Sequence, residues 1–134
     1  MDIPPEAQRR IAADQVAWLT TVSDRGAPTP NPVWFIPDGD QLVVYSEPTS
    51  RKVHNIEQRP LVSVHFNSDA DGGDVVVVAG RAELTPAQRL SSQPGYLDKY
   101  EAGFRALDMD IGVADATYST RITITPTKVR LTAG

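Results

Sequence analysis

The chain has 134 residues, of which 40% are hydrophobic and 22% charged, a composition typical of one globular domain with a hydrophobic core. Its formal net charge of -4 argues against nucleic acid as the main partner, because phosphate backbones attract basic surfaces. There is no cysteine, which excludes disulfides, a thiol nucleophile and a thiolate metal site. We therefore expect a single domain over residues 1–134.

Neither a membrane-spanning segment nor a metal site is expected from the sequence. No apolar run approaches the roughly 18 residues that a membrane helix needs. The first ten residues, MDIPPEAQRR, are polar and include acidic residues, unlike a signal peptide, which favours a cytoplasmic protein. The two histidines are isolated and the carboxylates are scattered, so no metal-ligand spacing is present.

The first part of the chain predicts a short helix followed by strands that tight turns connect. Pro4, Pro5 and Glu6 are typical of a helix start, so a helix is expected over residues 5–15. The segments that follow are rich in β-branched and aromatic residues, and the Asp-Gly pair at 38–39 is typical of a hairpin. We expect strands at residues 16–22, 27–36 and 41–46, with turns at 23–26 and 37–40.

The middle of the chain predicts a second helix and two further strands. A short helix is expected over residues 50–58, where it stops before a proline. The alternating segment 61–67 predicts a strand, and residues 68–74 predict a flexible loop. Residues 75–84 predict a long strand in which Gly80 marks a bulge.

The last third of the chain predicts helices and a closing strand. Thr85 and Pro86 are typical of a helix start, and Pro94 is expected to interrupt that helix. The other expected elements are a second helix ending near Leu107, a short helix or loop over 109–118 and a strand over 120–131. Six strands with hairpin-like returns favour an antiparallel barrel or a strongly curled sheet with helices at its openings. The βαβ alternation and the Gly-rich phosphate motifs of nucleotide-binding folds are absent.

Three prolines, Pro28, Pro30 and Pro32, occupy alternate positions of the strand expected over 27–36. Alternate backbone N–H groups of a strand point to the same edge, so these prolines remove donors from one edge only. The simpler interpretation is a sheet edge protected against further pairing. The functional interpretation is an opened strand that leaves backbone groups free for a flat ligand.

The helix expected over 50–58 begins with Arg51 and Lys52, directly after the capping residue Thr49 or Ser50. Free N–H groups already make a helix start positive, so each cation there costs roughly 0.3–1 kcal/mol. A phosphate bound at this helix start would reverse the penalty, accepting from the N–H groups, the hydroxyls and both cations. The alternative is a solvated pair of charges whose cost water screens.

Two motifs resemble the pyridoxamine 5'-phosphate oxidase-like, flavin-binding split β-barrel family. The first is VYSEPTSRKVHNIEQRPLVSVHF, with its S-R-K-x-x-N-I core between two strands, and the second is the upstream TTVSDRGAPTPNPVWFIPDGDQLVVYS. The resemblance covers roughly residues 10–84 and less clearly the last strand. It is greatest to the actinobacterial branch that uses the deazaflavin coenzyme F420 in place of FMN.

The resemblance implies a mainly β fold with flanking helices, a six-stranded antiparallel split β-barrel, and a homodimer with the cofactor in a groove between the protomers. By position, Ser50, Arg51 and Lys52 are expected to hold the cofactor phosphate. Tyr45 and Ser46 are expected along the ribityl chain. The residues expected to line the flat ring are Asn31, Pro32, Val33 and Trp34, and Asn55 completes the predicted cofactor site.

The function that the resemblance implies is an oxidoreductase that uses reduced F420 to transfer a hydride to a small organic substrate. An FMN-dependent oxidoreductase, a non-catalytic flavin or deazaflavin carrier, and a haem-binding relative remain alternatives. The arginine-rich C-terminal motif of the family members that oxidise pyridoxamine phosphate is missing, although Arg121 can still face a substrate. No catalytic residue is identified, with Tyr118 or solvent as possible proton donors. Arg59, on the face of Lys52 and Asn55, is the candidate to meet the extra carboxylates of F420.

Overall fold

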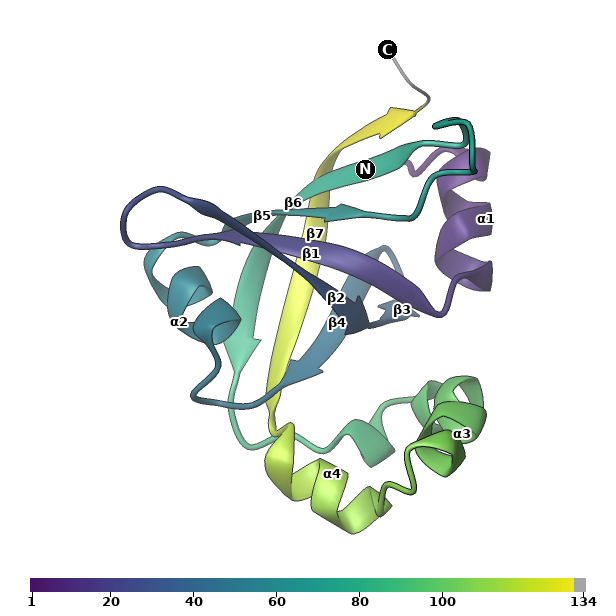
Figure 1. Cartoon of the computed structure of the whole chain (residues 1–134). Coiled ribbons are helices and arrows are strands. Elements are labelled where there is room, and N and C mark those ends of the chain that lie inside the picture. Colours follow the sequence, from purple (N-terminus) through teal and green to yellow (C-terminus); the bar gives the residue numbers. More distant parts are fainter. Residues whose placement is uncertain (132–134) are drawn as a thin grey trace.

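The computed structural model describes residues 1–131, so residues 132–134 of the expected domain lie outside the described part. One antiparallel sheet of seven strands, in the order β2-β1-β5-β6-β7-β4-β3, makes up most of it (Figure 1). The strands are β1 Val16–Val22, β2 Pro28–Trp34, β3 Ile36–Asp38, β4 Gln41–Ser46, β5 Leu61–His65, β6 Val76–Thr85 and β7 Thr120–Leu131. The helices are α1 Pro5–Ala13, α2 Arg51–Gln58, the short η1 Leu90–Ser92, α3 Tyr96–Ala106 and α4 Ile111–Thr117.

The expected six strands become seven within residues 1–131 because the segment 27–36 is interrupted at Phe35. β2 pairs with β1 at one end of the sheet, whereas β3 pairs with β4 at the other end. The chain therefore crosses from one sheet edge to the other at a single residue, which curls the sheet into a half-barrel. Phe35 donates its N–H to the Tyr100 hydroxyl over 2.7 Å, and its carbonyl accepts from the Lys99 ammonium over 2.7 Å.

The three alternate prolines lie on β2, an edge strand of the sheet. Thr29 lies opposite Thr21 in the pairing with β1, and the adjoining Ser23 donates its N–H to the Ala27 carbonyl. By strand alternation, the residues between the prolines face β1 and the proline nitrogens face away from it. The position of β2 fits the protected-edge interpretation.

The helix expected to start at Thr85 and Pro86 is absent, and only η1 forms before Pro94. β6 instead continues to Thr85, which pairs with Arg121 of β7. Ladder hydrogen bonds to a distant strand thus prevail over the local helix-start signal. The expected helix near Leu107 is confirmed as α3, and the ambiguous segment 109–118 contains α4.

The bulge expected at Gly80 is confirmed by a register shift between Ala79 and Gly80. A Cβ atom at Gly80 would lie 2.7 Å from Ile124 Cγ2 and 2.9 Å from the Thr125 carbonyl oxygen. Glycine is therefore required where β6 approaches β7 most closely.

The buried side chains form two clusters. The larger one fills the curled sheet beneath α1 and α2, which lie on opposite sides in Figure 1. The smaller one lies between the β3–β4 hairpin and the α3–α4 pair, which Figure 1 shows below the sheet. Within residues 1–131, no helix has the length and hydropathy needed to cross a membrane. The gap between these two clusters is where the main cavity opens.

Candidate functional site

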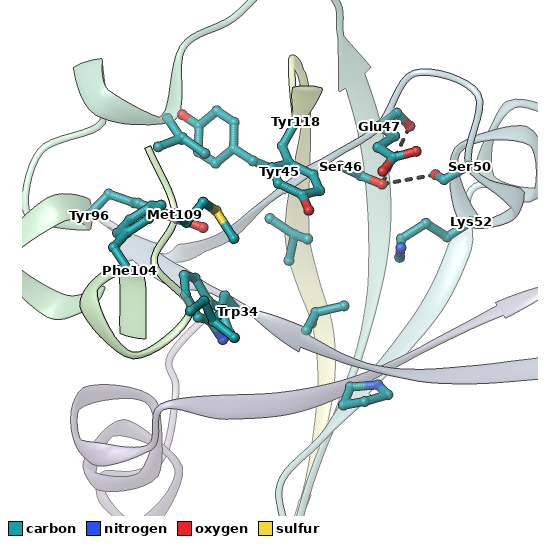
Figure 2. Close-up of a pocket in the computed structure, with 15 residues that line it drawn as sticks. Trp34, Tyr45, Ser46, Glu47, Ser50, Lys52, Tyr96, Phe104, Met109 and Tyr118 are labelled. Carbon is teal, nitrogen blue, oxygen red and sulfur yellow. Dashed lines mark hydrogen bonds between the residues drawn. The ribbon is translucent and has the colours of Figure 1, made fainter. Parts of the chain in front are cut away.

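A cavity of about 440 Å³ opens between β2, β4, the start of α2 and the α3–α4 pair (Figure 2). Its wall therefore combines residues from both halves of the chain. It is lined by Pro32, Val33, Trp34, Val44, Tyr45, Ser46, Glu47, Ser50, Lys52, Leu90, Tyr96, Phe104, Leu107, Met109 and Tyr118.

One end of the cavity is polar and is built from the β4–α2 connection. Ser50 caps α2, and its hydroxyl accepts from the Val53 N–H over 3.3 Å. The Ser46 and Ser50 hydroxyls are 2.9 Å apart, as the dashed line in Figure 2 shows. The N–H groups of Arg51 and Lys52, the first two residues of α2, have no acceptor among residues 1–131. This end therefore offers hydroxyls and free N–H groups to an anion.

Lys52 brings a positive charge to the same end of the cavity. Its side chain is half-buried and makes no ion pair with any described carboxylate. Burial lowers the pKa of Lys52 below its ordinary value, and the nearby Glu47 opposes that shift. A half-buried cation without a close counter-ion is costly in the unliganded protein, so the site favours an anionic ligand.

The other end of the cavity is aromatic. Trp34 stacks on Tyr100 with ring centroids 4.4 Å apart and meets the Phe104 ring edge-on at 5.4 Å. A Cβ atom at Gly103 would lie 2.8 Å from two atoms of the Trp34 ring, so only glycine lets the indole pack so closely on α3. Trp34 is thereby held rigidly as a wall of the cavity.

Tyr45 is fixed at the cavity wall by a chain of polar contacts behind it. Its hydroxyl donates to Gln93 Oε1 over 2.8 Å, and the Gln93 amide approaches Asp38 at 3.5 Å. Arg121, the cross-strand neighbour of Tyr45, donates to the same Asp38 carboxylate over 2.8 Å. Burial raises the pKa of Tyr45 above its ordinary value, against the opposing effect of Arg121. The Tyr45 ring, rather than a free hydroxyl, therefore faces the cavity.

The structure brings seven of the ten predicted cofactor residues to this cavity, namely Pro32, Val33, Trp34, Tyr45, Ser46, Ser50 and Lys52. Asn31, Arg51 and Asn55 do not line it. Asn31 and Arg51 are exposed; Arg51 follows the helix cap and lies about 100° around α2 from Lys52.

Asn55 is fully buried and faces the β1–β2 hairpin. Its amide donates to the Thr21 and Thr29 hydroxyls over 3.0 and 3.1 Å, and those hydroxyls are 2.9 Å apart. These bonds attach α2 to the hairpin, so Asn55 holds the helix in place.

Two arginines considered for the ligand are engaged elsewhere. Arg121 is bound to Asp38 and does not line the cavity. Arg59 is the C-terminal cap of α2, where it contacts Asp24, so it lies at the opposite end of the helix from Lys52.

The residues missed by sequence reasoning form the aromatic end, since Leu90, Tyr96, Phe104, Leu107 and Met109 were not assigned to any site. Tyr96, Tyr100 and Phe104 recur every four residues, which signals the buried face of a helix. That spacing does not indicate which part of the sheet the helix faces.

A family model described as pyridoxamine 5'-phosphate oxidase matches residues 3–133. No curated protein sequence matches the chain significantly. A solved structure described as an F420 reductase aligns with a TM-score of 0.75 and 23% identity, covering 96% of this chain and 98% of that one.

Two other similar structures carry different descriptions. A putative pyridoxamine 5'-phosphate oxidase from Listeria innocua aligns with a TM-score of 0.66 and 20% identity, over 93% of this chain and 94% of that one. The haem storage protein HutZ from Vibrio cholerae aligns with a TM-score of 0.65 and 15% identity, over 98% and 96%. At these identities the likeness establishes the fold.

Proposed function

The chain belongs to the pyridoxamine 5'-phosphate oxidase family, and from this premise we propose that it is an oxidoreductase that uses the deazaflavin coenzyme F420. FMN is the alternative cofactor on the same site. The substrate is a small organic molecule that accepts a hydride. The proposal rests on the polar and aromatic ends of a single cavity, whose chemistries match the two ends of such a cofactor.

The observation that carries the proposal is the position of Lys52. This cation is half-buried at the start of α2, close to the capping Ser50 hydroxyl and the free N–H groups of the first turn. A cation beside the positive helix start is unfavourable without an anion, whereas an anion bound there is stabilised by both. A phosphate group satisfies the hydroxyls, the N–H groups and the ammonium together.

The remaining lining residues suit the rest of the cofactor. Tyr45 and Ser46 lie next to each other on β4, with Ser46 at the polar end and Tyr45 toward the aromatic end, where a ribityl chain would extend. Val33 and Trp34 offer apolar surface for a flat ring system. A bound deazaflavin or flavin supplies the hydride chemistry, while the protein binds, orients and shields it.

Coenzyme F420 is preferred to FMN for two reasons. The similar structure described as an F420 reductase aligns over nearly the whole chain. Arg51 is exposed at the start of α2 outside the cavity, where carboxylates extending beyond a bound phosphate would pass. Arg51, rather than Arg59, is thus the cation best placed to meet them.

The functional protein is proposed to be a symmetric homodimer. Trp18 of β1 pairs with Pro32 of β2 and with His65 of β5, so these side chains share one face of the sheet. The Trp18 and His65 rings stack with centroids 6.1 Å apart, and Leu61 of β5 is 62% exposed. Because Pro32 also lines the cavity, a partner packed on this face would border the cofactor. Sedimentation at micromolar concentration should give about twice the chain mass of 14.6 kDa.

Titration of the purified protein with oxidised F420 and with FMN tests the cofactor assignment. We expect F420 to bind more tightly, with a difference that shrinks as salt screens its exposed carboxylates. Absorbance shifts of the cofactor and quenching of the tryptophan fluorescence, to which Trp34 in the cavity wall contributes, report binding independently of turnover. If FMN binds more tightly than F420 at both low and high salt, the proposed cofactor is FMN and not F420. If neither cofactor binds, the proposed function is refuted.

A further inference from the structure

Two tyrosine hydroxyls at the aromatic end of the cavity have no hydrogen-bond partner among residues 1–131. Tyr96 and Tyr118 both line the cavity, and no side-chain hydrogen bond of either residue is present. The Tyr96 side chain lies deep in the protein, with only 3% of its surface exposed. The Tyr96 hydroxyl oxygen is nevertheless not among the fully buried polar atoms, so it is accessible and free to donate to a ligand in the cavity.

The contrast with the other two tyrosines shows that this is a local feature. The Tyr45 hydroxyl donates to Gln93, and the Tyr100 hydroxyl bonds to the Phe35 backbone. Burial raises the pKa of Tyr96 well above its ordinary value, so its hydroxyl remains a donor throughout the physiological range. Tyr96 lies at the start of α3, and Tyr118 directly follows α4 (Figure 2).

The surroundings of these hydroxyls contain no charged lining residue. Trp34, Leu90, Phe104, Leu107 and Met109 form the rest of this end. The charged residues that line the cavity, Glu47 and Lys52, come from the β4–α2 side, where the cofactor phosphate is proposed to bind. A charged group would lose its hydration at the aromatic end without gaining a counter-ion, which is strongly unfavourable.

We propose that Tyr96 and Tyr118 form a substrate subsite that binds a neutral, flat molecule through its carbonyl oxygen. A carbonyl oxygen has two lone pairs and can accept from both hydroxyls, while an aromatic or conjugated frame packs against Trp34 and Phe104. This assignment rests on the proposed function, because it takes the polar end of the cavity to be filled by the cofactor. It narrows the substrate class to uncharged carbonyl compounds.

Matched probes test the subsite by equilibrium binding, with and without saturating oxidised cofactor. Acetylnaphthalene carries the carbonyl, ethylnaphthalene lacks it, and naphthoate carries a charge in its place. We expect the order acetylnaphthalene, ethylnaphthalene, naphthoate from tightest to weakest. Tyr96→Phe and Tyr118→Phe should each weaken acetylnaphthalene binding by about two- to tenfold, the value of one hydrogen bond, and leave ethylnaphthalene unaffected.

Two further readouts separate a ligand role from a structural one. Tyr96→Phe should melt close to the temperature of the unmodified protein, because it removes a hydroxyl that has no partner within residues 1–131. The control Tyr100→Phe should lower the melting temperature, since it breaks the contact with Phe35, and leave the acetylnaphthalene-to-ethylnaphthalene ratio unchanged.

The possible results distinguish this inference from the proposed function. An unchanged ratio in both Tyr96→Phe and Tyr118→Phe overturns the subsite, even if F420 or FMN binds normally. Failure of both cofactors to bind refutes the proposed function, while the probe ratios in the free protein still decide whether the tyrosines bind a carbonyl. With the polar end filled by saturating cofactor, tighter binding of naphthoate than of acetylnaphthalene also overturns the assignment to neutral substrates.

Discussion

Replacing Lys52 by methionine should separate ligand binding from stability. Methionine keeps much of the length of the side chain and removes its charge, and therefore the charge-assisted hydrogen bond to a bound phosphate. Such a bond contributes about 1.5–3 kcal/mol, so we expect the affinity for the phosphate-bearing cofactor to fall about 10- to 150-fold. Arg51→Met is the matched control, because Arg51 is the exposed neighbour outside the cavity. Screening should limit its effect to roughly fivefold or less.

The same substitution should not destabilise the unliganded protein. Burial lowers the pKa of Lys52, which means that the charged form is less favourable in the folded state than in the unfolded state. The penalty is fully present below the folded pKa and disappears as pH rises toward the unfolded value. At neutral pH, Lys52→Met removes it, so the variant should melt at or above the temperature of the unmodified protein.

The affinity for the phosphate-bearing cofactor should also depend on pH through this residue. In the unmodified protein, affinity should decline as pH rises through the lowered pKa of Lys52 and the ammonium loses its proton. The decline should be absent in Lys52→Met. Fluorescence titrations over a pH series, together with thermal melts of the free protein, measure both effects. With FMN, which lacks the carboxylates that Arg51 is proposed to meet, an affinity of Lys52→Met equal to that of the unmodified protein, or a larger loss in Arg51→Met, would show that the phosphate does not bind beside Lys52.

Three other substitutions test how the site is supported. Gly103→Ala would place a Cβ atom 2.8 Å from the Trp34 ring. We therefore expect a loss of about 1–3 kcal/mol in unfolding free energy and a change in tryptophan fluorescence. An unchanged melting temperature would show that α3 can move aside. Burial lowers the pKa of Lys99 to about 8 in the folded protein, against 10.5 in the unfolded chain. Between about pH 8 and pH 10.5, Lys99 therefore binds more protons in the unfolded chain than in the folded protein, so the free energy of unfolding should rise with pH. Urea unfolding should show that rise in the unmodified protein and a flatter profile in Lys99→Met, and identical profiles would contradict the lowered pKa. Asn55→Ala leaves the Thr21 hydroxyl without its amide partner, so urea unfolding should show a loss of about 1–3 kcal/mol, whereas an equal stability would mean that Asn55 does not hold α2.

Local sequence signals pointed to Ser50 and Lys52 at the polar end of the cavity, and the family resemblance added Ser46 a few residues earlier in the chain. Ser46, Ser50 and Lys52 lie within seven consecutive residues that form a strand end, a helix cap and a first helical turn. Cap preferences and the unfavourable charge at the helix start act over a few residues, so they are visible without knowledge of the fold. The bulge at Gly80 was predictable for a similar reason, since an isolated glycine within a β-rich run typically marks a bulge or a close approach of two backbones.

Tertiary contacts decided the features that local propensity left open or indicated wrongly. The extended segment 27–36 reads as one strand, and its division at Phe35 arises because its two parts pair with different strands at opposite sheet edges. Thr85 carries a helix-start signal, but pairing with Arg121, 36 residues away in the chain, keeps it in β6. Strand pairing contributes hydrogen bonds that no local preference of under about 1 kcal/mol can match.

The residues of the cavity also differ in whether local sequence or tertiary contacts determine their positions. The sequence by itself determined a capped helix start with two cations in its first turn and a predominantly antiparallel β fold, because both depend on short-range geometry and alternation. Only the folded chain decided that Lys52, rather than Arg51, enters the cavity and that Asn55 faces the hairpin instead. It also decided that Tyr96 and Tyr118 complete the opposite end, because helix periodicity identifies a buried face without specifying the surface against which it packs.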